Sequence, residues 1–597
     1  MRRTLLTLLA LCAVACQQVE YDPEDPAVGP GGMVGNDGPI TDGNFAGGND
    51  PLLDPRAVTP PSGDRPPNCD GACVAYCETS GLDNPVNKGL CRSLWGVGLA
   101  PMPVIRAEAC RRLYVDMLGR FPSAAEVEDV CGSGNWGEAV KRLMADPGFV
   151  LTQQKRHADR FLYSTEVVSL ERVYDMDRLV GKLSRGEVPY DLYAAVASAH
   201  PVLTRRYEDP GDMVEALFLN FMGRPPFDNE RADMARMYRL WHRGYYDHPY
   251  LNMRLPDAFI RFRCLDEETG QVDPNAKGEC TSVLWGYNEI IFTPDMRAAR
   301  SQEDDGDLTM WSGHLTPEEW RKLQAPGRVL ATRRTFWERA VEDVVEQYLG
   351  YNLTQQVPEV REELVDWLLQ HNGDIRSVHY AVATSMAYLQ SNAGDSGSPY
   401  RWTYGPINQV ESEVWIDSMA RAVGYALGAC DHRLSHPQTL VEAGSLSAYR
   451  LLNTSRWDLN EEGEVDMRYA ELARTLGGCP ENVVGGRFRV VSILTTATQM
   501  GFVASLCNPT RDPEVEGAAV EKLLPEGVGA SRALTVELAE QIATHQYRLF
   551  LGRPPNSTEL AEVREAATVC ANTLCSAEEF ARPACFALLS SAEMLFY

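Results

Sequence analysis

Apolar residues recur three and four positions apart through most of the chain beyond residue 105, which is the spacing of one face of an α-helix. The segments "CRRLYVDML", "VEALFLNFM" and "THQYRLFL" show this spacing most clearly. The alternation typical of a strand has little support. Only "FRVVSILTT" around Val490 is ambiguous, and "TTATQMGFVASL" after it is typical of a helix. The pattern therefore predicts a mostly α, multi-helical fold.

A short phrase follows these three apolar segments. Each copy has glycine, then arginine, then proline three positions after the glycine and glutamate seven positions after it. Glycine can take the left-handed conformation that ends a helix, and proline suits the turn before a new one. In "SAAE" and "NSTE" the first residue can cap the next helix while glutamate reaches back, as in a capping box. The twelve positions are Gly119, Arg120, Pro122, Glu126, Gly223, Arg224, Pro226, Glu230, Gly552, Arg553, Pro555 and Glu559.

The repeated arginine is predicted to pair with a local carboxylate or to cap helix carbonyls, because an enzyme seldom needs one catalytic group in several places. A weaker fourth copy begins at Gly350, where Thr354 is the predicted cap. We expect units of helix, LGRxP turn and helix to build two modules, at residues 106–395 and 396–597.

The N-terminal residues have the pattern of a signal sequence, which predicts export from the cytosol. Arg2 and Arg3 precede an apolar stretch too short to span a bilayer, and "AVAC" is typical of a lipobox ending at Cys16. Residues 1–16 are thus predicted to be a lipoprotein signal, with Cys16 carrying acyl chains such as palmitate. The alternative is an ordinary signal peptide in which Cys16 is incidental. Residues 17–68, rich in Gly, Pro and Asp, are predicted to form a disordered tether, before a small Cys-rich segment at 69–105.

The cysteines left after the signal and Cys16 number fourteen, and a chain outside the reducing cytosol is expected to form disulfides. Their connectivity stays open. A metal or cluster site at Cys69, Cys73 and Cys77 is the rival interpretation, but no histidine completes it. The disulfide candidates are Cys264, Cys280, Cys110, Cys131, Cys430, Cys479, Cys570, Cys575 and Cys585.

The net charge of −27 argues against a nucleic-acid partner, since binding phosphates needs a basic surface. It also disfavours docking to an anionic membrane face. Membrane association is therefore expected through the lipid anchor alone.

Sequence motifs for nucleophilic, zinc or nucleotide chemistry are absent. Glu413 and Asp417 lie four residues apart, so they could act as paired carboxylates, although an ion-pair ladder with Arg421 explains them more simply. His432, four residues before His436, is a weak metal or catalytic candidate. The loop "DLNEEGEVD" offers oxygens at Asp458, Asn460, Glu462, Glu464 and Asp466, as half of an EF-hand does, so Ca²⁺ is possible.

The segments "LYVDMLGRFPSAAEV…LMADPGF…RHADRFLYS" and "YGPINQVESEVWIDSMARAVGYALG" resemble a pair of domain families of unknown function typical of planctomycete surface proteins, often associated with cytochrome c domains. The resemblance covers about half of the predicted folded chain. It implies a secreted, helical, two-module protein and no agreed catalytic residues. A c-type haem would need C-x-x-C-H, which the chain lacks.

Together these features predict a cell-envelope lipoprotein, at the outer membrane and facing the periplasm or the surface. Its expected role is to bind or scaffold an envelope protein or a glycan. One alternative is an enzyme or electron-transfer accessory with a site between the modules. Another is a calcium-stabilised glycan-binding protein. The sequence favours a non-catalytic role over an enzyme and predicts no cofactor beyond possible Ca²⁺.

Overall fold

The computed structural model describes residues 84–96, 104–132, 134–163, 170–204, 207, 209–241, 317–391, 405–423, 472–473, 475–478, 492–508 and 520–597. Helices account for 73% of these residues and strands for none, which confirms the prediction of a mostly α fold. Within this part of the chain no helix is both long and apolar enough to cross a membrane. Several predicted features lie outside the described residues: Cys16, the tether at 17–68, His432, the calcium-type loop at 458–466, and Cys264, Cys280, Cys430 and Cys479.

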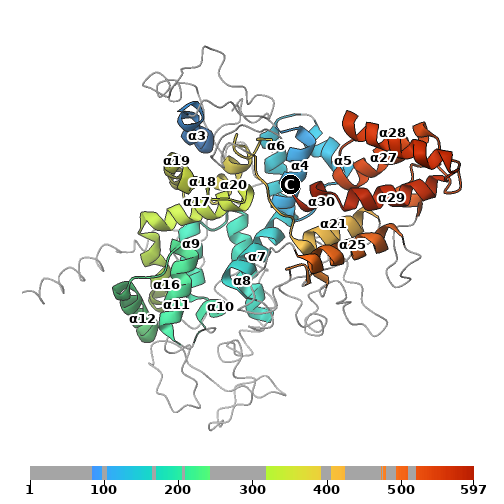
Figure 1. Ribbon diagram of the computed structural model, residues 1–597. Coiled ribbons are helices and arrows are strands. Elements are labelled where there is room, and N and C mark those ends of the chain that lie inside the picture. The colour runs from blue at the N-terminus through green and yellow to red at the C-terminus, as the bar shows by residue number, and fades with distance from the viewer. Residues whose placement is uncertain are drawn as a thin grey trace, which may run out of the picture.

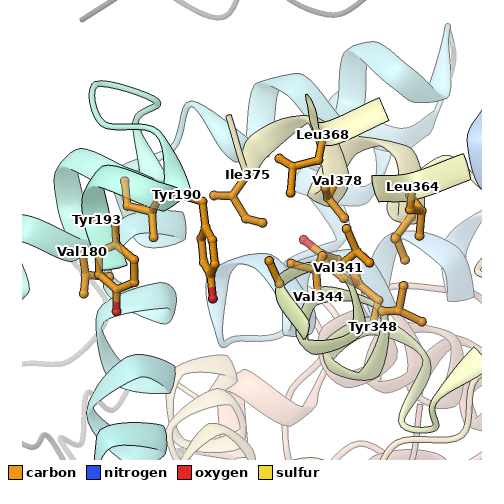
Figure 2. Packing of buried hydrophobic residues seen from close by; sticks show 14 of the residues in the cluster. Val180, Tyr190, Tyr193, Val341, Val344, Tyr348, Leu364, Leu368, Ile375 and Val378 are labelled. Carbon is orange, nitrogen blue, oxygen red and sulfur yellow. The ribbon is translucent and has the colours of Figure 1, made fainter. Parts of the chain in front are cut away.

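One group of helices forms a hydrophobic core with buried residues from Val86 to Leu389. Figure 2 shows part of it, where tyrosines of α9 and apolar side chains of α17 and α19 converge. The helices are α3 (Pro85–Gly96), α4 (Arg106–Leu118), α5 (Ala124–Glu126), the π-helical η3 (Val127–Gly132), α6 (Trp136–Met144), α7 (Pro147–Phe161), α8 (Leu170–Ser184), α9 (Tyr190–Ala199), α10 (Pro201–Thr204), α11 (Pro210–Met222), α12 (Asp228–Trp241), α16 (Pro317–Ala331), α17 (Arg334–Leu349), α18 (Leu353–Gln356), α19 (Pro358–Gln370) and α20 (Arg376–Ala383).

A second core gathers the later helices around Trp415, Phe502 and Phe580. Val115 of α4 and Phe121 after it belong to this second core, whereas Leu113 and Met117 of the same helix belong to the first. Figure 1 shows α4 between the two groups, with α30 beside it. The later helices are α21 (Ser412–Ala422), α25 (Ile493–Cys507), α26 (Val520–Leu523), α27 (Val536–Leu551), α28 (Ser557–Asn572), α29 (Ala577–Leu589) and α30 (Ala592–Leu595). Because α4 contributes to both cores, the boundary at residues 395/396 stays a prediction.

The three Gly-Arg turns have one geometry. Each glycine has φ between 61° and 69°, so it lies in the left-handed region and ends its helix. Each arginine makes two hydrogen bonds, of 2.5 to 2.9 Å, to the glutamate six residues later. That glutamate also accepts a hydrogen bond from a backbone N–H at the turn. The predicted local pairing is thus confirmed for Arg120 with Glu126, Arg224 with Glu230 and Arg553 with Glu559.

An aromatic ring completes each turn. The guanidinium carbon lies 5.0 to 5.3 Å from the ring centroid of the residue six positions earlier, which is cation–π distance. The rings are those of Tyr114, Phe218 and Tyr547. The arginine therefore ties the end of one helix to the start of the next, which is a structural role.

The fourth copy differs from its prediction at the cap. Gly350 has φ 69°, as expected, but the residue that caps the following helix is Asn352, whose side chain accepts from the N–H of Gln355. Thr354 already lies inside the first turn, and its hydroxyl donates to Asn352 Oδ1. Predicting Thr354 as the cap was wrong, because the helix begins at Leu353, one residue before it.

Three disulfides have both of their cysteines among the described residues. Cys110 pairs with Cys131 between α4 and η3, and Cys570 pairs with Cys575 at the end of α28. Cys585 of α29 pairs with Cys507 of α25, a residue that the sequence analysis did not single out. The prediction of a disulfide-stabilised fold is confirmed for this part of the chain.

Candidate functional site

A cleft of about 620 Å³ opens where three stretches of chain meet. Helix α7 contributes one side, α17 another, and residues 408–417 with the start of α21 a third. Tyr597 also lines the cleft. The volume lies within the range of about 300–1,000 Å³ that small-molecule sites occupy.

Helix α7 supplies two polar rows to the cleft. Asp146 caps the helix by accepting from the N–H of Gly148, and Pro147 occupies its first position. Residues four apart share a helical face, so Lys155 and Asp159 form one row. Arg156 and Arg160 form the neighbouring row, and all four residues line the cleft.

The first row meets the predicted carboxylates. Lys155 Nζ lies 2.7 Å from Glu411 Oε2 and 2.7 Å from Glu413 Oε1. Glu413 is buried, with 3% of its surface exposed. Glu413 and Asp417 both line the cleft, whereas His432, the third candidate of the inter-module hypothesis, lies outside the described residues. The expected partner on α21 was Arg421, whose side chain lies outside the described residues. Among the described residues, Glu413 pairs with Lys155 and accepts a hydrogen bond from the hydroxyl of Ser412 at 3.2 Å.

The second row meets α17. Arg160 forms an ion pair with Asp343, and Arg339 Nη2 lies 2.5 Å from Asp343 Oδ1. Burial raises the pKa of Asp343, although both guanidiniums oppose that shift. One carboxylate therefore serves two arginines.

Asp116 lies near Arg156. The side chain of Asp116 has no exposed surface. Its Oδ2 accepts from the hydroxyl of Tyr388 at 2.9 Å and its Oδ1 from the hydroxyl of Tyr597 at 2.7 Å. Arg156 Nη2 is 3.9 Å from Oδ1, too far for a hydrogen bond. Burial raises the pKa of Asp116 to about 7 despite these favourable contacts. The carboxyl of Asp116 is therefore close to half-protonated at neutral pH. It also links α4 to Tyr597.

Two histidines line the cleft in their neutral form. Burial lowers the pKa of His379 to about 3 and that of His157 to about 4. His379 Nδ1 lies 3.1 Å from the hydroxyl of Tyr348. Since imidazolium is absent from both near neutral pH, neither can act there as a general acid.

Metal binding finds no support in this part of the molecule. Among the described residues, no group of three or more His, Cys, Asp and Glu side chains is placed to hold a metal ion. The predicted calcium ligands and His432 lie outside these residues.

The sequence pattern alone did not single out the residues of α7, Asp116 or Tyr597. The segment "RHADRFLYS" of residues 156–164, quoted for the family resemblance, includes Arg156 and Arg160, so part of the signal was present. Tyr597 carried no local signal, because its partners are 189 and 481 residues away.

Comparison of the chain with protein-family models, with curated proteins and with solved structures gave no match. The resemblance to paired surface-protein domains therefore rests on the quoted motifs, and the function must be argued from the cleft.

Proposed function

We propose that this protein is a lipid-anchored envelope protein that binds a small polar ligand in the cleft between α7, α17 and residues 408–417. The observation that carries the proposal is the cleft itself, a concave space of about 620 Å³ lined by ionisable side chains from three separate segments. Concave sites with a few convergent polar groups are where proteins commonly hold small ligands.

The rest of the chain fits an extracytoplasmic role. A lipid on Cys16 would hold the protein at the membrane, and a disordered tether of residues 17–68 would give the body a reach of about 40 Å. Disulfides suit an oxidising compartment. We also infer that duplication of one helix–turn–helix unit built the body, since the three Gly-Arg turns share their contacts.

A catalytic role is the second candidate. The observation in its favour is that Glu413 and Asp417 both line the cleft, where paired carboxylates could move protons. Glu413 is already engaged in an ion pair with Lys155, which suits a binding wall better than an acid–base pair.

Ligand screening by thermal shift on the mature chain tests the binding proposal. Glu346 is exposed and lines the cleft from α17, so Glu346→Trp should fill part of the space. Glu359→Trp, on the exposed side of α19, is the matched control. A ligand that raises the Tm of the wild type and the control, but not of Glu346→Trp, supports the proposal. Equal binding to all three proteins would place the ligand elsewhere.

The anchor needs its own test. Labelled palmitate should enter the wild-type protein in its native envelope and should be lost from Cys16→Ser. Labelling that survives this substitution would contradict the lipobox prediction.

A further inference from the structure

The second row of α7, extended to Gln153, carries side-chain donors that have no hydrogen-bond partner among the described residues. Gln153, Arg156 and Arg160 follow one another at spacings of three and four residues, so they lie along one face of the helix. All three line the cleft. Buried polar groups are nearly always hydrogen-bonded, and a cluster of exceptions points to a bound group.

Gln153 is the most buried of the three, with 4% of its surface exposed. Its side-chain Nε2 is buried and has no hydrogen-bond partner among the described residues. Leaving such a donor without an acceptor costs about 1–3 kcal/mol. An acceptor from a ligand in the cleft would recover that loss.

Arg156 makes no side-chain hydrogen bond to any described residue, although its guanidinium has five N–H donors. Its nearest carboxylate, Asp116, is 3.9 Å away, and each oxygen of Asp116 already accepts from a tyrosine hydroxyl. About 27% of the side chain is exposed. Arg156 is therefore held in place by charge while its donors stay available to the cleft.

Arg160 also has spare donors. Its Nη1 pairs with Asp343 Oδ2, whereas its Nε and Nη2 are buried without a hydrogen-bond partner among the described residues. These donors lie one helical turn from those of Arg156, on the same face of α7.

From this arrangement we propose that the row of Gln153, Arg156 and Arg160 binds one oxyanion group, a carboxylate or a phosphate, of the ligand. The inference rests on the proposed binding function of the cleft and specifies its ligand class. A guanidinium matches the two oxygens of either group with parallel hydrogen bonds.

The first row of α7 and the carboxylates that it meets limit the rest of the ligand. Lys155 is the one cation of this row, and Glu411, Glu413 and Asp417 line the cleft with it. A ligand with a second anionic group would be repelled there. The ligand is therefore a small molecule with a single oxyanion on a neutral or cationic body, as in an amino acid or a phosphorylated amino alcohol.

Two matched probe pairs test the oxyanion. Glycine is compared with glycinamide, which lacks the carboxylate, and O-phosphoethanolamine with ethanolamine, which lacks the phosphate. Binding to the mature protein is measured by calorimetry and thermal shift at neutral pH. The oxyanion member of at least one pair should bind at least tenfold more tightly than its partner, and the pair that responds identifies the group. No preference in either pair would overturn the inference.

Variants locate the contact. Arg156→Gln should weaken binding of the preferred oxyanion by about tenfold or more, the loss typical of a charged hydrogen bond. Arg142→Gln, at an exposed arginine of α6, is the matched control and should bind as the wild type does. Gln153→Met keeps the volume and should weaken binding about threefold, because it removes one uncharged donor. Equal affinity in wild type and Arg156→Gln would overturn the assignment.

The outcomes separate the two proposals. If a screened ligand is lost with Glu346→Trp but shows no preference for an oxyanion, the cleft binds ligands and this inference fails. If no ligand responds to Glu346→Trp, the proposed function fails first.

Discussion

Replacing Asp116 by asparagine should change how the stability of the protein depends on pH. The folded carboxyl has a pKa of about 7, against 3.8 for an unperturbed aspartate. Between these values the folded chain holds a proton that the unfolded chain has released. The stabilisation from this proton is fully present below about pH 4. It falls steadily as the pH rises and is lost once the pH has passed through 7.

The magnitude follows from linkage. One excess proton in the folded state lowers the free energy of unfolding by about 1.4 kcal/mol for each unit that the pH rises. From pH 5 to pH 8 the folded pKa of about 7 gives a loss of about 3 kcal/mol from this one group. Asparagine does not titrate, so the variant should lack this loss.

The histidines act in the opposite direction. Unfolded histidine takes up a proton near pH 6.5, whereas burial lowers the pKa of His379 to about 3 and of His157 to about 4. Stability from these two groups is present above pH 6.5 and is lost as the pH falls. The wild-type curve mixes both trends, and the difference between wild type and Asp116→Asn isolates the carboxyl.

The assay is urea unfolding of both proteins, followed by tryptophan fluorescence at pH 5, 6, 7 and 8. The stability of the wild type relative to Asp116→Asn should fall by about 3 kcal/mol across this range. Asp129→Asn, in an exposed pair with Arg142, corrects for the loss of one negative charge. A difference that changes by less than about 1 kcal/mol would refute the assignment of a raised pKa to Asp116.

Three further substitutions test the packing. Gly327→Ala should destabilise the protein by about 3 kcal/mol, because a Cβ there would lie 2.3 Å from the carbonyl oxygen of Ala194. A calorimetric Tm within 1 °C of wild type would contradict the contact between α16 and α9. Arg553→Met should lower the free energy of unfolding by about 2 kcal/mol, because two glutamates lose their common partner. An unchanged midpoint of urea unfolding would argue against a structural role for this turn. Removing the Cys507–Cys585 disulfide by a double alanine substitution should lower the free energy of unfolding by about 4 kcal/mol, because the bond closes a long loop. Equal stability of both proteins would mean that the bond is absent in solution.

The sequence predicted local features of the fold well. Three local features depend on residues within eight positions of one another. They are the end of a helix at Gly119, the capping box of the next helix and the pairing of Arg120 with Glu126. The ring of Tyr114 was also within reach, since an aromatic residue stands six positions before the arginine in all three copies. The cap at Gly350 was predicted wrongly because neighbouring asparagine and threonine side chains can both cap a helix.

The site was harder to predict. Glu413 and Asp417 stood out because two carboxylates four apart form a recognisable pattern. Lys155 did not, because its partners lie more than 250 residues away and no periodicity connects them. The high pKa of Asp116 was equally hidden, since it results from burial between Tyr388 and Tyr597, which tertiary packing alone brings together.

Tyr597 connects two of the segments beside the cleft. Tyr597 exchanges two backbone hydrogen bonds with Asn408, and its hydroxyl donates to Asp116 on α4. Residues 408–417 and α7 therefore face each other across the cleft only when both cores have docked around α4. A ligand that contacts α7 and residues 408–417 together would bind the docked state alone. By linkage it would stabilise that state by RT ln(1 + [L]/Kd), about 2.7 kcal/mol at a hundredfold excess over Kd.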